Sequence, residues 1–254
     1  MTTTTQVQYS GGELQRILNV TRLHLTNKFP LMVMPLLILG FIFLVNYFIW
    51  WLIASVTDEE GAANAAEGMQ FSGASTFIFI YMLVVAVQAV NLTFPFALGY
   101  SVTRRDFYLG SSLMFALLSV YYAAIMTIMA VIERATNGWG FNGAMFDVVY
   151  FGADNPLQQF ALYLLVFLFF FFVGAATASV YVRWRANGMY VFWAVLTFLV
   201  IGLVALTTVT DSWPLVGEWF VANGPIGVAL WSLLPTALAA LTGFVLLRKA
   251  TPKN

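Results

Sequence analysis

Six long apolar runs dominate this sequence. They occupy residues 30–54, 76–99, 109–132, 157–182, 187–209 and 225–247. Each is close to the ~20 residues that an α-helix needs to cross the hydrocarbon core of a bilayer. Charged residues make up 9% of the chain, whereas a soluble domain usually has ~25%. We therefore predict an all-α membrane protein with six transmembrane helices.

The charges between these runs predict the topology. Every Lys and Arg except Arg134 lies in the first, third, fifth or seventh of the segments outside the runs, and most acidic residues lie in the others. Loops rich in Lys and Arg usually stay in the cytoplasm. The pattern predicts cytoplasmic tails at 1–28 and 251–254, a six-span domain at 29–250, and both termini in the cytoplasm.

Residues 12–27 have a helical pattern before the first run. Four apolar side chains fall on one helical face: Leu14, Ile17, Leu18 and Leu25. Arg16 and Arg22 fall elsewhere, as expected for a helix that lies in the membrane interface. We predict an amphipathic helix here. The alternative is an unstructured cytoplasmic tail.

A short polar loop separates the second run from the third. Burying Arg104 or Arg105 at the centre of a bilayer would cost ~2.5–3.5 kcal/mol each, so both must lie in water or among headgroups. Thr103 followed by Asp106 has the form of a capping box. We expect a short helix along the membrane face that presents both arginines and the aromatic pair 107–108 to a neighbour. The alternative is that the arginines only anchor the topology.

The interiors of the runs lack ionisable side chains, which argues against ion-coupled transport and voltage sensing. The chain has no cysteine and one histidine, and it has no P-loop. We therefore expect no enzymatic activity, no bound cofactor and no metal site. Three neutral polar residues inside the runs either join helices or line a pathway: Asn46, Gln88 and Asn91.

The last outer segment, residues 211–225, is rich in aromatic residues. It is too short and too interrupted to span a bilayer, and it contains Pro214 near its start. Trp213 and Trp219 suit the headgroup level, where tryptophan is enriched. We predict that this segment is re-entrant and folds back into the outer leaflet.

The loop and its flanks read Ala97-Leu-Gly-Tyr-Ser-Val-Thr-Arg-Arg-Asp-Phe-Tyr-Leu-Gly110. This stretch, with the six runs and the amphipathic segment before them, resembles the permease subunits of ATP-binding-cassette (ABC) exporters, specifically the ABC-2 membrane family. In the first cytoplasmic loop of that family a small residue, Ser or Thr, a basic residue and an aromatic residue recur in this order.

The resemblance implies that residues 101–108 are a coupling helix that docks on a separate ATPase. The implied docking residues are Ser101, Thr103, Arg104, Arg105, Asp106, Phe107 and Tyr108. Residues 12–27 would be the connecting helix, and residues 211–224 would close the outer end of the pathway.

The implied partners are two copies of an ABC-type ATPase subunit, a second permease subunit that is identical or homologous, and membrane lipid. ATP and Mg²⁺ would bind to the ATPase, and no nucleic acid is expected. The implied location is the plasma membrane. The alternative function is a non-transporting scaffold or assembly factor that recruits a soluble partner through the same loop. The family resemblance leaves the substrate open.

Overall fold

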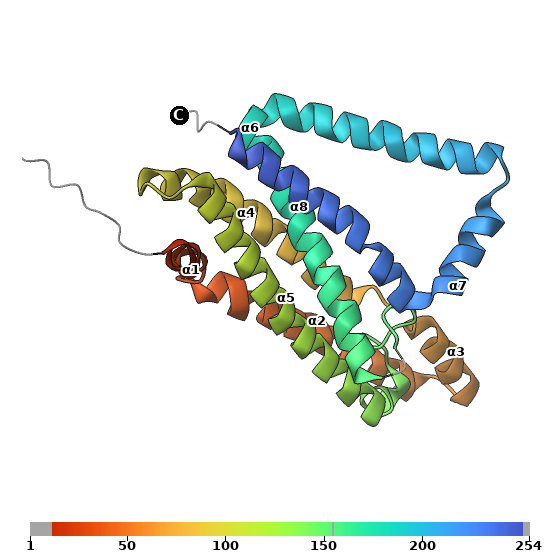
Figure 1. Ribbon diagram of the computed structural model, residues 1–254. Helices are drawn as coiled ribbons and strands as arrows, with labels where there is room; N and C mark the ends of the chain where they lie inside the picture. Colours follow the sequence, from red (N-terminus) through yellow and green to blue (C-terminus); the bar gives the residue numbers. More distant parts are fainter. Residues whose placement is uncertain (1–11, 154, 251–254) are drawn as a thin grey trace, which may run out of the picture.

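The computed structural model describes residues 12–153 and 155–250, and every regular element in them is a helix. This confirms the prediction of an all-α chain (Figure 1). Five helical stretches in the described part are long and apolar enough to cross a membrane. The predictions for the ends of the two tails, at 1–11 and 251–254, lie outside the described residues.

The elements follow the apolar runs over the first half of the chain and depart from them in the second half. In chain order they are α1 (Glu13–His24), η1 (Phe29–Val33), α2 (Met34–Val56), α3 (Glu59–Met69), η2 (Ala74–Thr76), α4 (Phe77–Gly99), α5 (Arg104–Ala135), η3 (Gly138–Asn142), α6 (Pro156–Val209), α7 (Trp213–Trp231) and α8 (Leu233–Arg248).

Helix α6 contains both the fourth and the fifth predicted runs. Its 54 residues would measure about 80 Å if straight, much more than the ~30 Å hydrocarbon core of a bilayer. The helix is broken at Arg185, whose backbone has φ 57° and ψ −148°. Figure 1 shows the chain changing direction within α6. The element is therefore two helical segments joined by a sharp break.

The sixth predicted run is divided between α7 and α8. Helix α7 covers the predicted re-entrant segment and is interrupted at Gly224, with φ 60° and ψ 179°. Glycine adopts a positive φ without a steric penalty, and Pro225 follows it directly. Ser232 then separates α7 from α8.

The core lies between α4, α5, the first segment of α6 and α8. Aromatic rings fill it: Phe79 lies 4.7 Å from Phe167, and Phe115 lies 5.2 Å from Phe171, between ring centroids. A Cβ atom at Gly174 would lie 2.4 Å from the carbonyl oxygen of Leu83. Helices α4 and α6 can therefore cross closely only because position 174 has no side chain.

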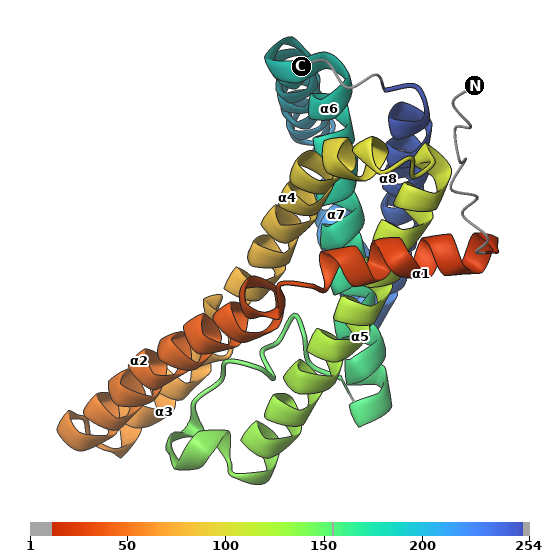
Figure 2. The same cartoon turned by 90° about the vertical axis from the view of Figure 1, so that its left-hand side faces the viewer.

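Two parts of the chain extend from this bundle. Figure 2 shows α1 lying across α5, and Figure 1 shows the second segment of α6 and α7 standing apart from the other helices. Nearly every side chain from 190 to 209 is exposed. Because these side chains are mostly apolar, their exposure is consistent with contact with lipid.

Candidate functional site

The turn between α4 and α5 contains the predicted coupling loop, and backbone hydrogen bonds define its shape. The Val102 amide donates to the Ala97 carbonyl at 3.2 Å, and the Ser101 amide donates to the Leu98 carbonyl at 3.0 Å. Ser101 has a left-handed φ of 61°. This is a Schellman motif, which ends a helix by satisfying its last carbonyl groups.

Thr103 starts the next helix. Its Oγ1 accepts a hydrogen bond from the Asp106 amide at 3.1 Å, which confirms the predicted N-terminal cap. The expected separate short helix is wrong, because α5 continues from Arg104 to Ala135 without interruption. No proline occurs in that range to end it. Residues 104–108 are therefore the first turns of a long helix.

Two ion pairs connect this turn to α1. The Arg16 Nε lies 2.8 Å from the Asp106 Oδ2, and the Asp106 side chain is only 3% exposed. The Arg105 guanidinium lies 2.8 Å from the Glu13 carboxylate, and both of these side chains are largely exposed. Exposed pairs contribute about 0–1 kcal/mol, so the buried Asp106 is the more important attachment.

Hydrogen bonds and close packing extend the attachment along α1. Thr21 Oγ1 donates to the Gly110 carbonyl at 3.0 Å, and His24 Nε2 lies 2.8 Å from Ser111 Oγ. A Cβ atom at Gly110 would lie 2.6 Å from the Val20 Cβ. We refer to α1 and residues 100–111 together as the cytoplasmic junction, because the predicted topology places both in the cytoplasm.

The helix predicted before the first span is present as α1, and its predicted apolar face is partly buried: Ile17, Leu18 and Leu25 are half-buried, and Leu25 packs against the core. The buried residues of α1 are Val20, Thr21 and His24. Leu14 from the predicted apolar face is 69% exposed. The helix therefore attaches to α5 by one face and leaves Leu14 exposed.

Phe107 and Tyr108 do not face outward, so the expectation that they contact a partner is wrong. Phe107 is fully buried against Phe94, at 5.2 Å between ring centroids. The Tyr108 hydroxyl donates to the Ala240 carbonyl at 2.5 Å. These positions lie on the inner face of α5, where they fasten it to α4 and α8.

The α4–α5 turn offers a smaller exposed surface to a partner than we expected. Ser101, Thr103 and Arg105 are exposed, and Tyr100 is 65% exposed. Arg104 is partly buried, and its guanidinium donates to the Arg248 carbonyl at the end of α8, at 3.0 Å. A soluble partner would therefore meet the tip of the turn.

His24, the single histidine of the sequence, lies in this junction. Its side chain packs between Thr93, Ser111 and the ring of Phe107. Burial lowers its pKa from 6.5 to about 4, because the charged imidazolium would lose its hydration. His24 is therefore neutral at neutral pH and acts as a hydrogen-bonding core residue.

The polar residues predicted to line a pathway are not hydrogen-bonded to one another across α2 and α4 in the described residues. The Asn46 side chain donates to the Ile42 carbonyl of its own helix, at 2.8 Å. Gln88 and Asn91 lie on α4, and the Asn91 Oδ1 is buried without a hydrogen-bond partner. No hydrogen bond joins Asn46 to either of them in the described residues.

The aromatic residues of the predicted re-entrant segment lie on the first turns of α7. Trp213 is 51% exposed and Trp219 is 39% exposed, and Pro214 takes a position near the helix start that suits proline. Trp213 Nε1 donates to Thr208 Oγ1 at 3.2 Å. The segment is thus helical, as re-entrant segments often are, and its depth in the membrane stays a prediction.

Sequence reasoning missed a polar network at the opposite end of the bundle. Glu133 is 3% exposed. Its carboxylate accepts hydrogen bonds from the amides of Met145, Phe146 and Asp147, at 2.8–3.2 Å, and from Trp139 Nε1. A carboxylate with this many donors fastens the loop after α5 to the end of that helix.

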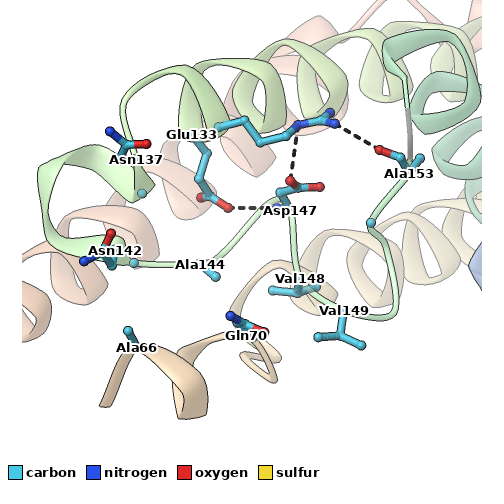
Figure 3. Close-up of a pocket in the computed structure, with 14 residues that line it drawn as sticks. Ala66, Gln70, Glu133, Asn137, Asn142, Ala144, Asp147, Val148, Val149 and Ala153 are labelled. Atoms are coloured by element: carbon cyan, nitrogen blue, oxygen red, sulfur yellow. Dashed lines mark hydrogen bonds and ion pairs between the residues drawn. The ribbon is translucent and has the colours of Figure 1, made fainter. Parts of the chain in front are cut away.

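Arg134 extends this network to α6. It lies 3.2 Å from Asp147 and donates to Gln159 Oε1 at 2.6 Å. Burial raises the pKa of Asp147, and Arg134 partly opposes the shift. A cavity of about 640 Å³ lies beside these residues, between the loop and α3 (Figure 3). The adjacent Glu133 and Arg134 at the end of a run, followed by glycines, were the available sequence signal.

None of these clusters has the chemistry of a metal centre. No group of three or more His, Cys, Asp or Glu side chains in the described residues could hold a metal ion. Comparisons with protein-family models, with curated proteins and with solved structures gave no match to this chain. The resemblance to ABC-2 permeases therefore stays a prediction from residues 97–110 and from the arrangement of the apolar runs.

Proposed function

We propose that this chain is the membrane-spanning permease subunit of an ABC exporter of the ABC-2 type. The observation that carries the proposal is the cytoplasmic junction. Asp106 and Gly110 join the start of α5 to α1 through an ion pair and a close helix crossing. A force applied to the turn would therefore move α5 and α1 together.

The proposal includes six spans with both termini in the cytoplasm, in the plasma membrane. The break at Arg185 allows α6 to supply the fourth and fifth spans, because each segment alone is long enough to cross a bilayer. The sixth span would consist of α8 with the end of α7. This assignment puts the junction, the α6 break and the end of α8 on the cytoplasmic side of the membrane.

In the proposed mechanism, a separate ATPase subunit contacts the exposed tip of the turn. Tyr100, Ser101 and Arg105 would provide that contact, while Phe107 and Tyr108 would transmit the force inward through their contacts with α4 and α8. When two ATPase subunits bind ATP and close against each other, they would shift these helices as rigid bodies. Substrate would pass between this chain and a second permease subunit.

Capture of the partner tests this proposal. The tagged full chain is crosslinked in its native membrane and purified, and its partners are identified by mass spectrometry. We expect a soluble protein with a P-loop. Tyr100→Ala should reduce its recovery, since truncating a true interface anchor costs at least about 2 kcal/mol. Arg105→Lys keeps the charge but loses the planar fork of hydrogen-bond donors, so it should weaken capture as well.

Phe96→Ala is the matched control. Phe96 is 52% exposed and lies one helical turn before Tyr100, with their rings 4.8 Å apart. It should leave capture unchanged. Recovery of a soluble partner without an ATPase motif would favour the scaffold alternative. Wild-type recovery with Tyr100→Ala and with Arg105→Lys would refute the assignment of this turn as the coupling surface.

A further inference from the structure

Three helix ends carrying basic residues converge at the same end of the bundle. The Arg104 guanidinium at the start of α5 hydrogen-bonds to the Arg248 carbonyl at the end of α8. Helix α8 contacts the first segment of α6, since a Cβ at Gly243 would lie 3.6 Å from the Ala176 Cα. The two run in the same direction (Figure 1), so the end of α8 lies level with Arg183.

Arg104, Arg183 and Arg248 form no ion pair within the described part of the chain. Its ion pairs use Arg16, Arg105 and Arg134. Arg183 and Arg248 have no carboxylate partner among the described residues, and Lys249 follows Arg248 directly. The converging ends therefore form a surface with excess positive charge, which would attract an anionic group.

An apolar groove begins beside this charge. It has a volume of about 680 Å³ and lies along α6 on both sides of the break, lined by Val180, Trp184, Gly188, Val191, Val195 and Leu199. A Cβ at Gly188 would lie 2.4 Å from the Trp184 Cβ. The absence of a side chain at 188 therefore allows the bend that shapes the groove.

Arg183 connects the charge to the groove. Its guanidinium carbon lies 4.7 Å from the ring centroid of Trp184, and Trp184 lines the groove. An arginine held over an aromatic ring is fixed in direction while its N–H donors stay available. The site thus has cationic donors at one end and an apolar channel at the other.

We propose that this site binds an anionic phospholipid of the cytoplasmic leaflet. The phosphate would be bound by Arg183, with Arg248 and Lys249 adding positive potential, and one acyl chain would lie in the groove. A lipid uses both features, whereas an acidic protein surface would use only the charge. The inference requires that the helices lie in a membrane, but it does not require the chain to be a permease.

Native mass spectrometry of the full chain in detergent tests the headgroup contact. The protein is incubated with phosphatidylglycerol or with phosphatidylcholine of the same acyl chains, and the retained lipid is measured. We expect preferential retention of phosphatidylglycerol. Arg183→Gln should lower it about fivefold, the effect of one basic residue near an anionic membrane surface. The control Arg22→Gln removes an equal charge from an exposed site on α1 and should not change retention.

A second pair of variants tests the groove without changing charge. Val195→Trp should fill the groove and lower phosphatidylglycerol retention, while Val204→Trp, on an exposed position of the same segment outside the groove, should not. Excess glycerol 3-phosphate should not displace the lipid. Displacement by glycerol 3-phosphate would show a free-phosphate site and overturn the proposal. Arg183→Gln is also tested in the ATPase capture experiment. If this variant lost capture of the ATPase but retained the lipid as the wild type does, the surface would be a docking site for a protein, and the lipid proposal would be overturned.

Discussion

Gly110 is a residue at which α1 and α5 approach closely. A methyl group there would lie 2.6 Å from the Val20 Cβ and 2.7 Å from the Ile17 carbonyl oxygen. We expect Gly110→Ala to destabilise the folded chain by about 1–3 kcal/mol, the usual cost of overpacking. The measurement is the midpoint of thermal unfolding in detergent.

Gly202→Ala provides the comparison. Gly202 also lies inside a helix, but a Cβ there would meet no atom within 4 Å. Alanine should stabilise this position by about 0.5–1 kcal/mol, because glycine loses more backbone entropy on folding. Equal effects of the two substitutions would contradict the close crossing of α1 over α5.

His24 predicts a pH dependence for the attachment of α1. Its pKa falls from 6.5 to about 4 on folding. The unfolded state therefore binds a proton more readily, and the stabilisation is complete above pH 6.5 and lost as the pH falls toward about 4. The full loss corresponds to about 3 kcal/mol.

Hydrogen exchange of the α1 amides measures this effect. Exchange should accelerate as the pH falls through the window below 6.5, after correction for the intrinsic rate, and His24→Gln should remove that dependence. Glutamine can still hydrogen-bond to Ser111 but has no titratable group. Protection that stays constant across the window in the wild type would show that His24 is not the controlling group.

At the scale of elements, the end of α4 provides a test of backbone geometry. Ser101 occupies the left-handed position of a Schellman motif, with φ 61°, where glycine is usual. Ser101→Gly should stabilise the chain by up to about 1 kcal/mol, because relief of the left-handed strain exceeds the entropy cost of glycine, and Ser101→Val should destabilise it, because a β-branched residue is strained at positive φ. Thermal unfolding of the two variants checks both directions. A stabilising Val substitution would mean that the turn has another shape.

The sequence predicted some of these elements well. Three apolar runs correspond to α2, α4 and α5, because apolar segments of about 20 residues form helices that can span a bilayer, and α4 continues through Pro95. Thr103 was correctly assigned as a helix cap, since that role depends only on residues within one turn. The direction in which Phe107 points could not be predicted, because it depends on packing against Phe94 of α4 and His24 of α1.

Other features depended equally on distant contacts. The gap between the fourth and fifth predicted runs contains the break at Arg185, but no local signal marks the positive φ there, because arginine does not favour that conformation. The role of Glu133 became visible only when the loop at 145–147 folded back onto it. Local patterns indicate where helices start, whereas the pairing of buried polar groups requires the three-dimensional fold.

At the scale of the whole molecule, four segments lie toward one end of the bundle: α1, the α4–α5 turn, the break in α6 and the end of α8 (Figures 1 and 2). The proposed docking of an ATPase and the proposed lipid site both require that this end is cytoplasmic. Five spans, with α6 crossing only once, would instead place the end of α8 opposite the turn.

Cysteine labelling distinguishes these arrangements directly, since the chain has no cysteine of its own. Single cysteines are placed at the exposed positions Ser101, Ala186 and Lys249, with Ala63 on α3 as the opposite side. In intact cells, a membrane-impermeant thiol reagent should label only the cysteine at Ala63, and the other three should react after the membrane is opened. Labelling of Ala186 or Lys249 in intact cells would contradict the six-span account and both proposals that rest on its cytoplasmic face.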